Sequence, residues 1–204
     1  MPEATRTVRA TFRTMREACA CVTQFTIARV VPVAVEVLDR SAIQAVESEF
    51  AFGLAADAGA LLLVAVDGSQ PEVERASLIV EQVLRDGGGF DLIRAVTREE
   101  EDRLWDVRRA LSPAMKKYGT LKLNEDVVVP RSRVPELVER VEEIGRRYQT
   151  FVVNFGHAGD GNIHVNFMCE REDKEAVRRA REAVRATFKV AVELGGTISG
   201  EHGI

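Results

Sequence analysis

Hydrophobic positions along the chain follow two alternating patterns. Short runs rich in β-branched and aliphatic residues predict strands, and longer segments with apolar residues at every third or fourth position predict helices. The predicted strands cover Val8–Phe12, Pro32–Leu38, Ala60–Val66, Asp91–Val96, Lys122–Val129, Thr150–Phe155 and Asn162–Met168. The chain should therefore alternate short strands with longer amphipathic helices.

The clearest predicted helix is Ser132–Tyr148, in which Val134, Leu137, Val138 and Val141 form one apolar stripe opposite Arg and Glu residues. A second helix is predicted over Glu72–Leu84, and the last over about Asp173–Leu194. The last helix is followed directly by Gly195-Gly196, which fits a left-handed C-terminal cap.

The order of the predicted elements is roughly βαβ(α)βαβα, then βα, a hairpin and a final helix. Strands and helices joined in this order resemble a ferredoxin-like split βαβ unit, extended or partly repeated. We therefore expect an α+β fold with a mostly antiparallel sheet and helices packed on one side. A doubly wound nucleotide-binding fold is less favoured, because no glycine-rich turn follows the first strand.

Composition narrows the function classes. The 204 residues are 46% hydrophobic and 29% charged with a formal net charge of −4, which predicts one large globular domain or two small halves. A slightly acidic balance argues against sequence-independent nucleic-acid binding. No apolar run approaches the roughly 18 residues of a membrane span. The first residues contain no apolar signal core, so we expect a cytoplasmic protein.

All three histidines lie in two glycine-rich segments. His157 and His164 flank Gly159-Asp160-Gly161, which predicts a tight turn between two strands. Side chains that face each other across such a hairpin have Cβ atoms about 5 Å apart if they pair directly. Two imidazoles at that distance can hold one divalent ion, and Glu201, in a glycine-flanked loop, could supply an oxygen ligand.

Two histidines and one carboxylate leave coordination positions open, as in a catalytic metal site. The alternative is a glycine-rich turn that carries two surface histidines and no metal. The additional presence of Asn166, Glu201, His202 and the glycines favours the metal site.

The two histidine motifs, His157-Ala-Gly-Asp-Gly-Asn-Ile-His164 and Gly195-Gly-Thr-Ile-Ser-Gly-Glu-His202-Gly, resemble the C-terminal (cap) domain of the FAD-linked oxidases. That family includes the glycolate oxidase large subunit, D-lactate dehydrogenase and D-2-hydroxyglutarate dehydrogenase. Other segments resemble the same domain in the same order, namely Pro32–Asp39, Leu63–Gly68, Leu104–Arg108 and Asn124–Pro130. The resemblance spans nearly the whole chain and implies a flavoenzyme that oxidises a 2-hydroxy acid.

The resemblance also implies roles for the motif residues. His157, His164 and Glu201 would ligate Zn²⁺, Mn²⁺ or a similar divalent ion, which would bind the hydroxyl and carboxylate oxygens of the substrate. His202 matches the general base of the family, and an imidazole titrates in a useful range for that task. Asn166 matches a position that contacts the substrate.

Arg108 matches an arginine that binds a substrate carboxylate, and a bidentate guanidinium suits that role. On a helix Ser112 would share a face with Arg108, at a position where the family often has a hydroxyl. The alternative is that Arg108 is an ordinary solvated charge. Asn124 stands where some relatives have a lysine that binds a second substrate carboxylate. Lys122, two residues earlier on the same face of the strand, is the alternative candidate for that contact. The missing lysine favours a monocarboxylate substrate such as glycolate or lactate.

The family places an FAD-binding domain before this region, so residues 1–204 correspond to the cap domain alone. We expect the missing domain to bind most of the FAD and this chain to be inactive by itself. The expected partners are a small 2-hydroxy acid and an FAD-binding domain or subunit, with a homodimer left open. The alternatives are a stand-alone ferredoxin-like module that binds a metal or small ligand without catalysis, and an interaction subunit.

Overall fold

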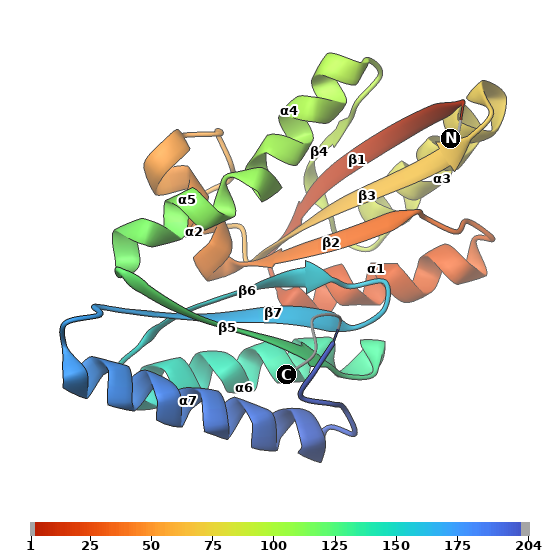
Figure 1. Cartoon of the computed structure of the whole chain (residues 1–204). Helices are drawn as coiled ribbons and strands as arrows, with labels where there is room; N and C mark the ends of the chain where they lie inside the picture. Colours follow the sequence, from red (N-terminus) through yellow and green to blue (C-terminus); the bar gives the residue numbers. More distant parts are fainter. Residues whose placement is uncertain (1–2, 201–204) are drawn as a thin grey trace.

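The computed structural model describes residues 3–200, which form one sheet with helices on both faces (Figure 1). All seven predicted strands are confirmed, with modest shifts at their ends. They are β1 Ala4–Phe12, β2 Ala34–Asp39, β3 Ala60–Gly68, β4 Phe90–Arg94, β5 Leu121–Val128, β6 Phe151–His157 and β7 Asn162–Cys169. The strand order is β4-β1-β3-β2-β6-β7-β5, and every neighbouring pair is antiparallel.

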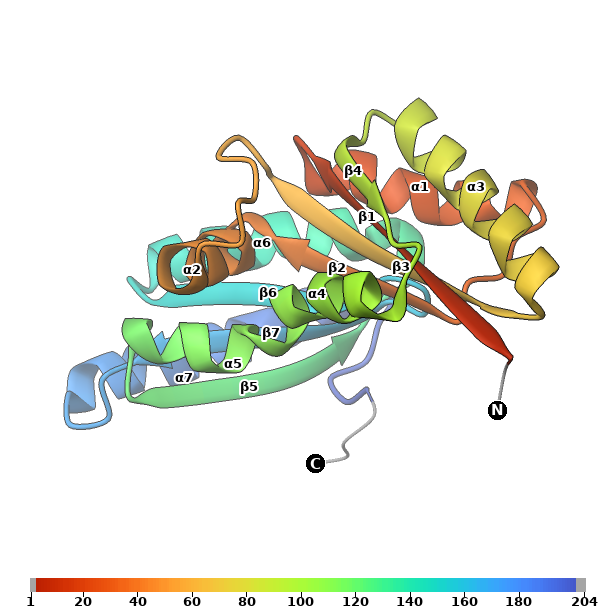
Figure 2. The same cartoon turned by 90° about the horizontal axis from the view of Figure 1, so that it is seen from above.

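The helices divide between the two faces of the sheet (Figure 2). One face is covered by α1 Met15–Ile27, α3 Gln70–Asp86, α6 Val134–Arg147 and α7 Lys174–Glu193. The opposite face is covered in part by α2 Arg40–Phe50, α4 Arg98–Arg109 and α5 Leu111–Met115. Two short 3₁₀ turns complete the list, η1 Lys116–Tyr118 and η2 Arg131–Arg133. The predicted helical layer is thus joined by a second, partial layer on the other face.

The sheet consists of two related halves. The first runs β1-α1-β2-α2-β3-α3-β4, with its strands in the spatial order β4-β1-β3-β2. The second runs β5-α6-β6-β7-α7, with the spatial order β6-β7-β5. Both orders are those of a split βαβ unit. The predicted extended, partly repeated ferredoxin-like arrangement is therefore confirmed.

Strand β3 shows why the sheet has a core on both faces. Successive side chains of a strand point to opposite sides. Leu62 and Val64 pack in the core beneath α1 and α3, whereas Leu61 and Leu63 pack in the core beneath α2 and α4. A continuous apolar run is what a central strand with two covered faces requires.

Capping residues set the ends of the helices. Thr14 and Glu17 form a capping box at the start of α1, with each side chain accepting a hydrogen bond from the backbone N–H of the other residue. Gly195 adopts φ +78° directly after α7, as the Gly-Gly pair predicts. Within residues 3–200 no helix is both long and apolar enough to cross a membrane.

The two halves meet at a short junction between β2 and β6. Three residue pairs span it, namely Glu36 with His157, Val37 with Gly156, and Leu38 with Phe155.

Asp39, which follows directly, adds a side-chain link at the same junction. Its carboxylate caps α2 by accepting a hydrogen bond from the Ala42 N–H at 2.7 Å. It also accepts from the backbone N–H and the side-chain amide of Asn154 in β6, at 2.9 and 2.8 Å. The strand pairing between the halves is therefore short, and buried polar side chains reinforce it.

Asp39 should make the stability of the chain depend on pH. Burial raises the pKa of its carboxyl from 3.8 to about 7, against hydrogen bonds from Ala42 and Asn154 that lower it. Between pH 3.8 and about 7 the folded chain retains a proton on Asp39 that the unfolded chain releases. The free energy of unfolding therefore falls as the pH rises through this range. Urea unfolding at a series of pH values should show the fall in the parent and a flatter profile in Asp39→Asn. Equal slopes in the two proteins would contradict the assignment, and exposed Asp102→Asn serves as the control.

Candidate functional site

Polar side chains gather at the junction of the two halves, on the sheet face that α2, α4 and α5 partly cover. Strand register places Glu36, His157 and Asn162 in one row across β2, β6 and β7. The next row contains Phe155 of β6 and His164 of β7. Because residues two apart on a strand share a face, both histidines lie on the same side of the sheet.

The β6–β7 hairpin brings the two imidazoles together. They lie diagonally rather than directly opposite, with ring centroids 5.3 Å apart and the rings nearly perpendicular. The tight turn predicted between them is present, and its Gly161 has φ +85°. A Cβ atom on Gly161 would lie 2.1 Å from the carbonyl oxygen of Val129, so glycine is required for β5 to approach the turn.

A buried carboxylate holds each imidazole by the same ring atom. The Nδ1 atom of His157 contacts Oε1 of Glu36, and the Nδ1 atom of His164 contacts Oδ1 of Asp126. Glu36 is 5% exposed and Asp126 is 9% exposed. Histidines that ligate metals commonly turn one ring nitrogen to a carboxylate, which fixes the tautomer and directs the other nitrogen to the ion. Both rings therefore have the support expected of ligands that bind through Nε2.

Glu36 also binds Arg108, which connects α4 to the junction. The Arg108 Nε atom donates to Oε2 of Glu36 at 2.7 Å, and the guanidinium carbon lies 4.3 Å from the centroid of the Phe155 ring. Arg108 is thus a partner of a buried carboxylate rather than a solvated helix charge. Within residues 3–200, its two Nη atoms have no recorded hydrogen bond or ion pair.

Trp105 and Ser112 flank Arg108 on successive turns of the α4–α5 segment. The indole Nε1 atom of Trp105 donates to Oγ1 of Thr7 in β1 at 3.0 Å, which fastens α4 to the sheet. Ala110 is helical and connects α4 to α5, so the predicted common face persists across the boundary. Ser112 itself is exposed, and the structure records no hydrogen bond from its hydroxyl to residues 3–200.

Asn166 lies two residues beyond His164 and is fully buried. Its side-chain amide donates to the backbone carbonyls of Val153 and His164, at 3.3 and 3.1 Å. Its Oδ1 atom is buried and has no hydrogen-bond partner within residues 3–200. A buried acceptor without a donor calls for an explanation such as a bound ligand. Asn124, the cross-strand partner of Asn166, is exposed.

The third predicted metal ligand, Glu201, and the predicted base, His202, lie outside the described residues. Among residues 3–200 no group of three or more His, Cys, Asp and Glu side chains is placed to hold a metal ion. The described part of the candidate site is therefore a pair of histidines with their carboxylates, Arg108 and Asn166.

Sequence reasoning missed Glu36 and Asp126. Glu36 stands between two valines in Val35-Glu36-Val37, and Asp126 directly precedes Val127-Val128. Acidic residues are seldom fully buried unless paired, so this placement was the available signal. Their histidine partners, 121 and 38 residues away along the chain, become evident only with the strand order.

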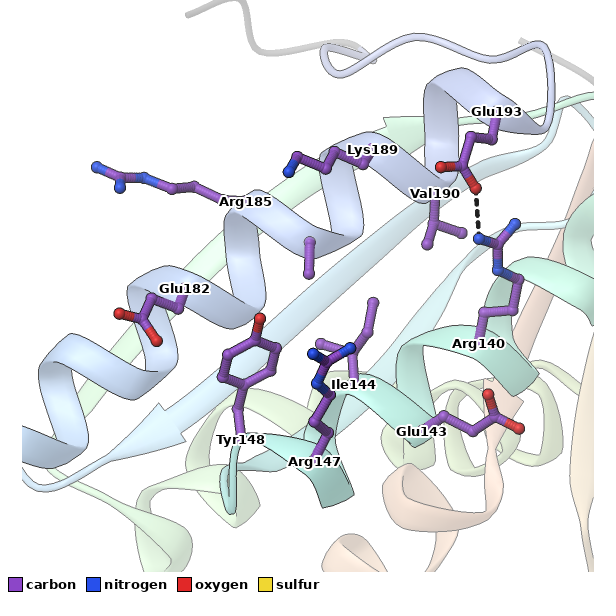
Figure 3. Close-up of a pocket in the computed structure, with 11 residues that line it drawn as sticks. Arg140, Glu143, Ile144, Arg147, Tyr148, Glu182, Arg185, Lys189, Val190 and Glu193 are labelled. Atoms are coloured by element: carbon purple, nitrogen blue, oxygen red, sulfur yellow. Dashed lines mark hydrogen bonds and ion pairs between the residues drawn. The ribbon is translucent and has the colours of Figure 1, made fainter.

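A separate hollow of about 540 Å³ lies between α6 and α7 (Figure 3). Its rim carries mixed charges, and Arg140 donates to Glu193 across it. Tyr148 and Ile144 form part of the wall. None of the predicted site residues lines this hollow, so it is separate from the histidine pair.

Comparison with known proteins matches the whole chain to one family. The family model described as "FAD linked oxidases, C-terminal domain" matches residues 1–204. The glycolate oxidase subunit GlcD of Bacillus subtilis is 32% identical over 203 residues, which cover 100% of this chain and 43% of that protein. GlcD of Escherichia coli K12 is 30% identical, with 100% and 41% covered. A D-lactate dehydrogenase of Archaeoglobus fulgidus is 31% identical, with 95% and 41% covered.

Solved structures confirm the fold at low sequence identity. A structure of p-cresol methylhydroxylase with substrate bound superposes with a TM-score of 0.74 at 11% identity, covering 97% of this chain and 45% of that one. An alkyldihydroxyacetonephosphate synthase gives a TM-score of 0.71 at 14% identity, covering 97% and 41%.

The chain spans about two fifths of the length of the curated relatives it matches. With a family model that covers every residue and a relative 32% identical along the whole chain, this protein belongs to the family of FAD-linked oxidase C-terminal domains.

Proposed function

We propose that this chain is the substrate- and metal-binding cap domain of an FAD-dependent 2-hydroxy-acid dehydrogenase that acts on glycolate or a D-lactate-like acid. The observation that carries the proposal is the pair of imidazoles at the junction, each fixed by a buried carboxylate. Its relatives include glycolate oxidase subunits and D-lactate dehydrogenases, which supports the substrate class. A cytoplasmic location and a homodimer stay predictions.

A divalent ion suits the donor chemistry of the junction. His157 and His164 offer two nitrogen ligands, and Glu36 and Asp126 orient the rings. Glu201 is the proposed oxygen ligand, which would leave positions open for substrate. When bound, Zn²⁺ or Mn²⁺ would act as a Lewis acid that lowers the pKa of a coordinated hydroxyl.

The residues around the imidazole pair can orient a small hydroxy acid. Glu36 fixes the Nε edge of Arg108, so the Nη atoms can bind a substrate carboxylate. The buried Oδ1 atom of Asn166 can accept a hydrogen bond from the substrate. Ser112 is the proposed hydroxyl contact, and His202 is the proposed acceptor of the hydroxyl proton. FAD, held mainly by the rest of the protein, would supply the two-electron oxidant.

The proposed preference for a monocarboxylate comes from β5. Asn124 pairs with Asn166 of β7, and both side chains lie on the same side of the sheet. Asn124 offers no positive charge to a second carboxylate. Lys122 lies two residues earlier on the same face, beside Met168 of β7, and is exposed. A substrate with one carboxylate, bound by Arg108, is therefore the better match.

Metal binding tests the imidazole pair directly. His157→Ala should abolish stoichiometric Zn²⁺ or Mn²⁺ binding measured by titration calorimetry, because one of two nitrogen ligands is lost. Glu36→Gln should weaken binding by roughly 10- to 100-fold through loss of ring orientation. Glu139→Gln, an exposed carboxylate paired with Arg16 on the surface, should bind as the parent does. Unchanged metal content in His157→Ala would rule out the proposed ligand.

Reconstitution tests the role of the chain as a cap. Mixing it with a separately expressed FAD-binding domain should restore flavin binding and reduction of a dye by glycolate or D-lactate. Arg108→Met should raise KM for the acid by roughly 100-fold, as expected for loss of a charge-assisted pair. Arg98→Gln, an exposed arginine at the start of α4, is the matched control. Tight metal binding without any reconstitution would instead favour a stand-alone binding module.

A further inference from the structure

A second cavity, of about 400 Å³, opens beside the edge strand β4 on the face of the sheet that α4 partly covers. It falls in the size range of sites for small organic ligands. The side chains that line it come from β1, β4, α4 and the segment after α2. They are Arg9, Phe52, Ile93, Arg94, Glu100, Arg103, Leu104, Asp106 and Val107. None of them belongs to the site described above.

The edge of the sheet is irregular at this cavity. The register of β1 against β4 shifts between Arg9 and Thr11, so β4 carries a bulge beside the opening. Asp91 in the bulge adopts φ +48°, a left-handed conformation that non-glycine residues seldom take. This conformation accompanies an ion pair in which Nη2 of Arg9 donates to Oδ2 of Asp91 at 2.8 Å. The backbone of β4 is thus distorted at the point where it holds Arg9 in place.

Arg9, which lines the cavity, retains an unused donor. The residue is 6% exposed, and its guanidinium makes the Asp91 contact through Nη2. Its Nε atom is buried and has no acceptor within residues 3–200. Leaving a buried donor of a charged group unsatisfied is costly, and an oxygen of a bound anion would remove that cost.

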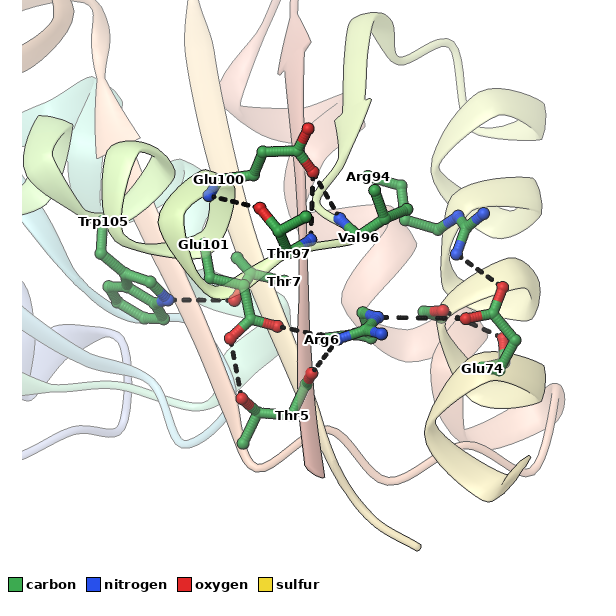
Figure 4. Close-up of polar contacts among 11 residues, drawn as sticks. Thr5, Arg6, Thr7, Glu74, Arg94, Val96, Thr97, Glu100, Glu101 and Trp105 are labelled. Atoms are coloured by element: carbon green, nitrogen blue, oxygen red, sulfur yellow. Dashed lines mark hydrogen bonds and ion pairs between the residues drawn. The ribbon is translucent and has the colours of Figure 1, made fainter. Parts of the chain in front are cut away.

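The other charged groups of the lining divide into two classes. Arg94 binds Glu74 and Glu81, and Glu100 accepts from the backbone N–H groups of Val96 and Thr97, as Figure 4 shows in part. Asp106 accepts from Arg109. Arg103, in contrast, makes no hydrogen bond or ion pair with the described residues. Among residues 3–200, the lining groups that retain a donor without a hydrogen bond are therefore the guanidinium of Arg103, which interacts electrostatically with Glu100, and the Nε atom of Arg9, whose charge is paired with Asp91.

The rest of the wall is apolar and stays partly open. Phe52, Leu104 and Val107 line it, together with Ile93, whose side chain is 41% exposed although it is large and hydrophobic. Inorganic anions would satisfy the two arginines but leave this apolar surface wet. A carboxylate that carries a short hydrocarbon body satisfies both parts of the lining.

We propose that this cavity, formed by Arg9, Ile93, Arg103, Leu104 and Val107, is a second ligand site that binds a small organic monocarboxylate with an apolar body. The carboxylate binds between Arg9 Nε and the Arg103 guanidinium, and the hydrocarbon part packs against Ile93, Leu104 and Val107. The assignment rests on this cavity alone and is independent of the metal and flavin chemistry proposed for the histidine pair.

The second site is close to the first. Arg9 and Glu36 both pair with Leu63 of β3, one from each side, so they are two strand spacings apart, about 10 Å. Helix α4 supplies Leu104 and Val107 to the cavity and Arg108 to Glu36. Trp105 donates to Thr7 and Thr5 donates to Glu101, which fasten the same helix to β1 (Figure 4). A ligand in the cavity therefore contacts the helix that positions Arg108.

Titration calorimetry of the full chain with hexanoate and with phenylacetate tests the proposal. We expect saturable one-to-one binding of at least one probe. Arg103→Gln should weaken it by about tenfold or more, as should Arg9→Met, because each loses a charge-assisted contact. Ile93→Trp should abolish it by filling the cavity. Arg98→Gln, on the same helix but outside the lining, and His157→Ala, at the other site, should bind as the parent does.

Several results would overturn the proposal. Absence of saturable binding for both hexanoate and phenylacetate would overturn it. It would also be overturned if the parent bound 1-hexanol or inorganic phosphate as tightly as the carboxylate probes. Loss of binding in His157→Ala would place the probe at the histidine pair instead. Arg9 is buried, so its variant could fail to fold. In that case the test relies on Arg103→Gln and Ile93→Trp, which are both at exposed positions. If these two variants bind the probe with the affinity of the parent, the proposed site is wrong.

Discussion

The pairing of β2 with β6 is the interaction on which the site depends. It consists of three residue pairs and joins two halves, each of which has the strand order of a split βαβ unit. Two buried side chains of β2 contact β6 across this junction, Glu36 to His157 and Asp39 to Asn154. A shift of this pairing by one residue would turn Glu36 to the opposite face, because side chains alternate along a strand. The register of the junction thus determines whether the polar cluster exists.

From this register the geometry of the cluster follows. The second half contributes both imidazoles and Asp126, the first half contributes Glu36, and α4, which connects the halves, contributes Arg108. Neither half has the whole arrangement. Buried charges are tolerated in this cluster because they are paired with one another. Glu36 is paired with both His157 and Arg108, and a buried carboxylate needs such partners to remain inside the protein.

The sequence predicts the elements well because their signals are local. Most strands contain a short apolar or alternating run of residues, and a single glycine pair marks the end of α7. The signal of the paired histidines is also local, since a tight turn and six residues separate His157 from His164. What the sequence does not reveal is the partner of each buried charge. Arg108 and Glu36 are 72 residues apart, and only the strand order brings them together.

The diagonal placement of the two histidines has the same origin. The turn was predictable from glycine and aspartate, but the strand register that pairs His157 with Asn162 is not evident from the sequence. The bulge at Asp91 was equally unpredictable, because the ion pair that accompanies its left-handed conformation involves Arg9 on another strand. Glu201 and His202 lie outside the described residues and stay predictions from the resemblance.

The central claim is that one divalent ion binds both imidazoles at the junction of the halves. Anomalous diffraction from crystals of the chain grown with Zn²⁺ or Mn²⁺ measures this directly. We predict one strong anomalous peak about 2.0–2.2 Å from Nε2 of both His157 and His164, with Nδ1 of each ring still on its carboxylate. A peak bound to neither ring, or to only one of them, would contradict the assignment.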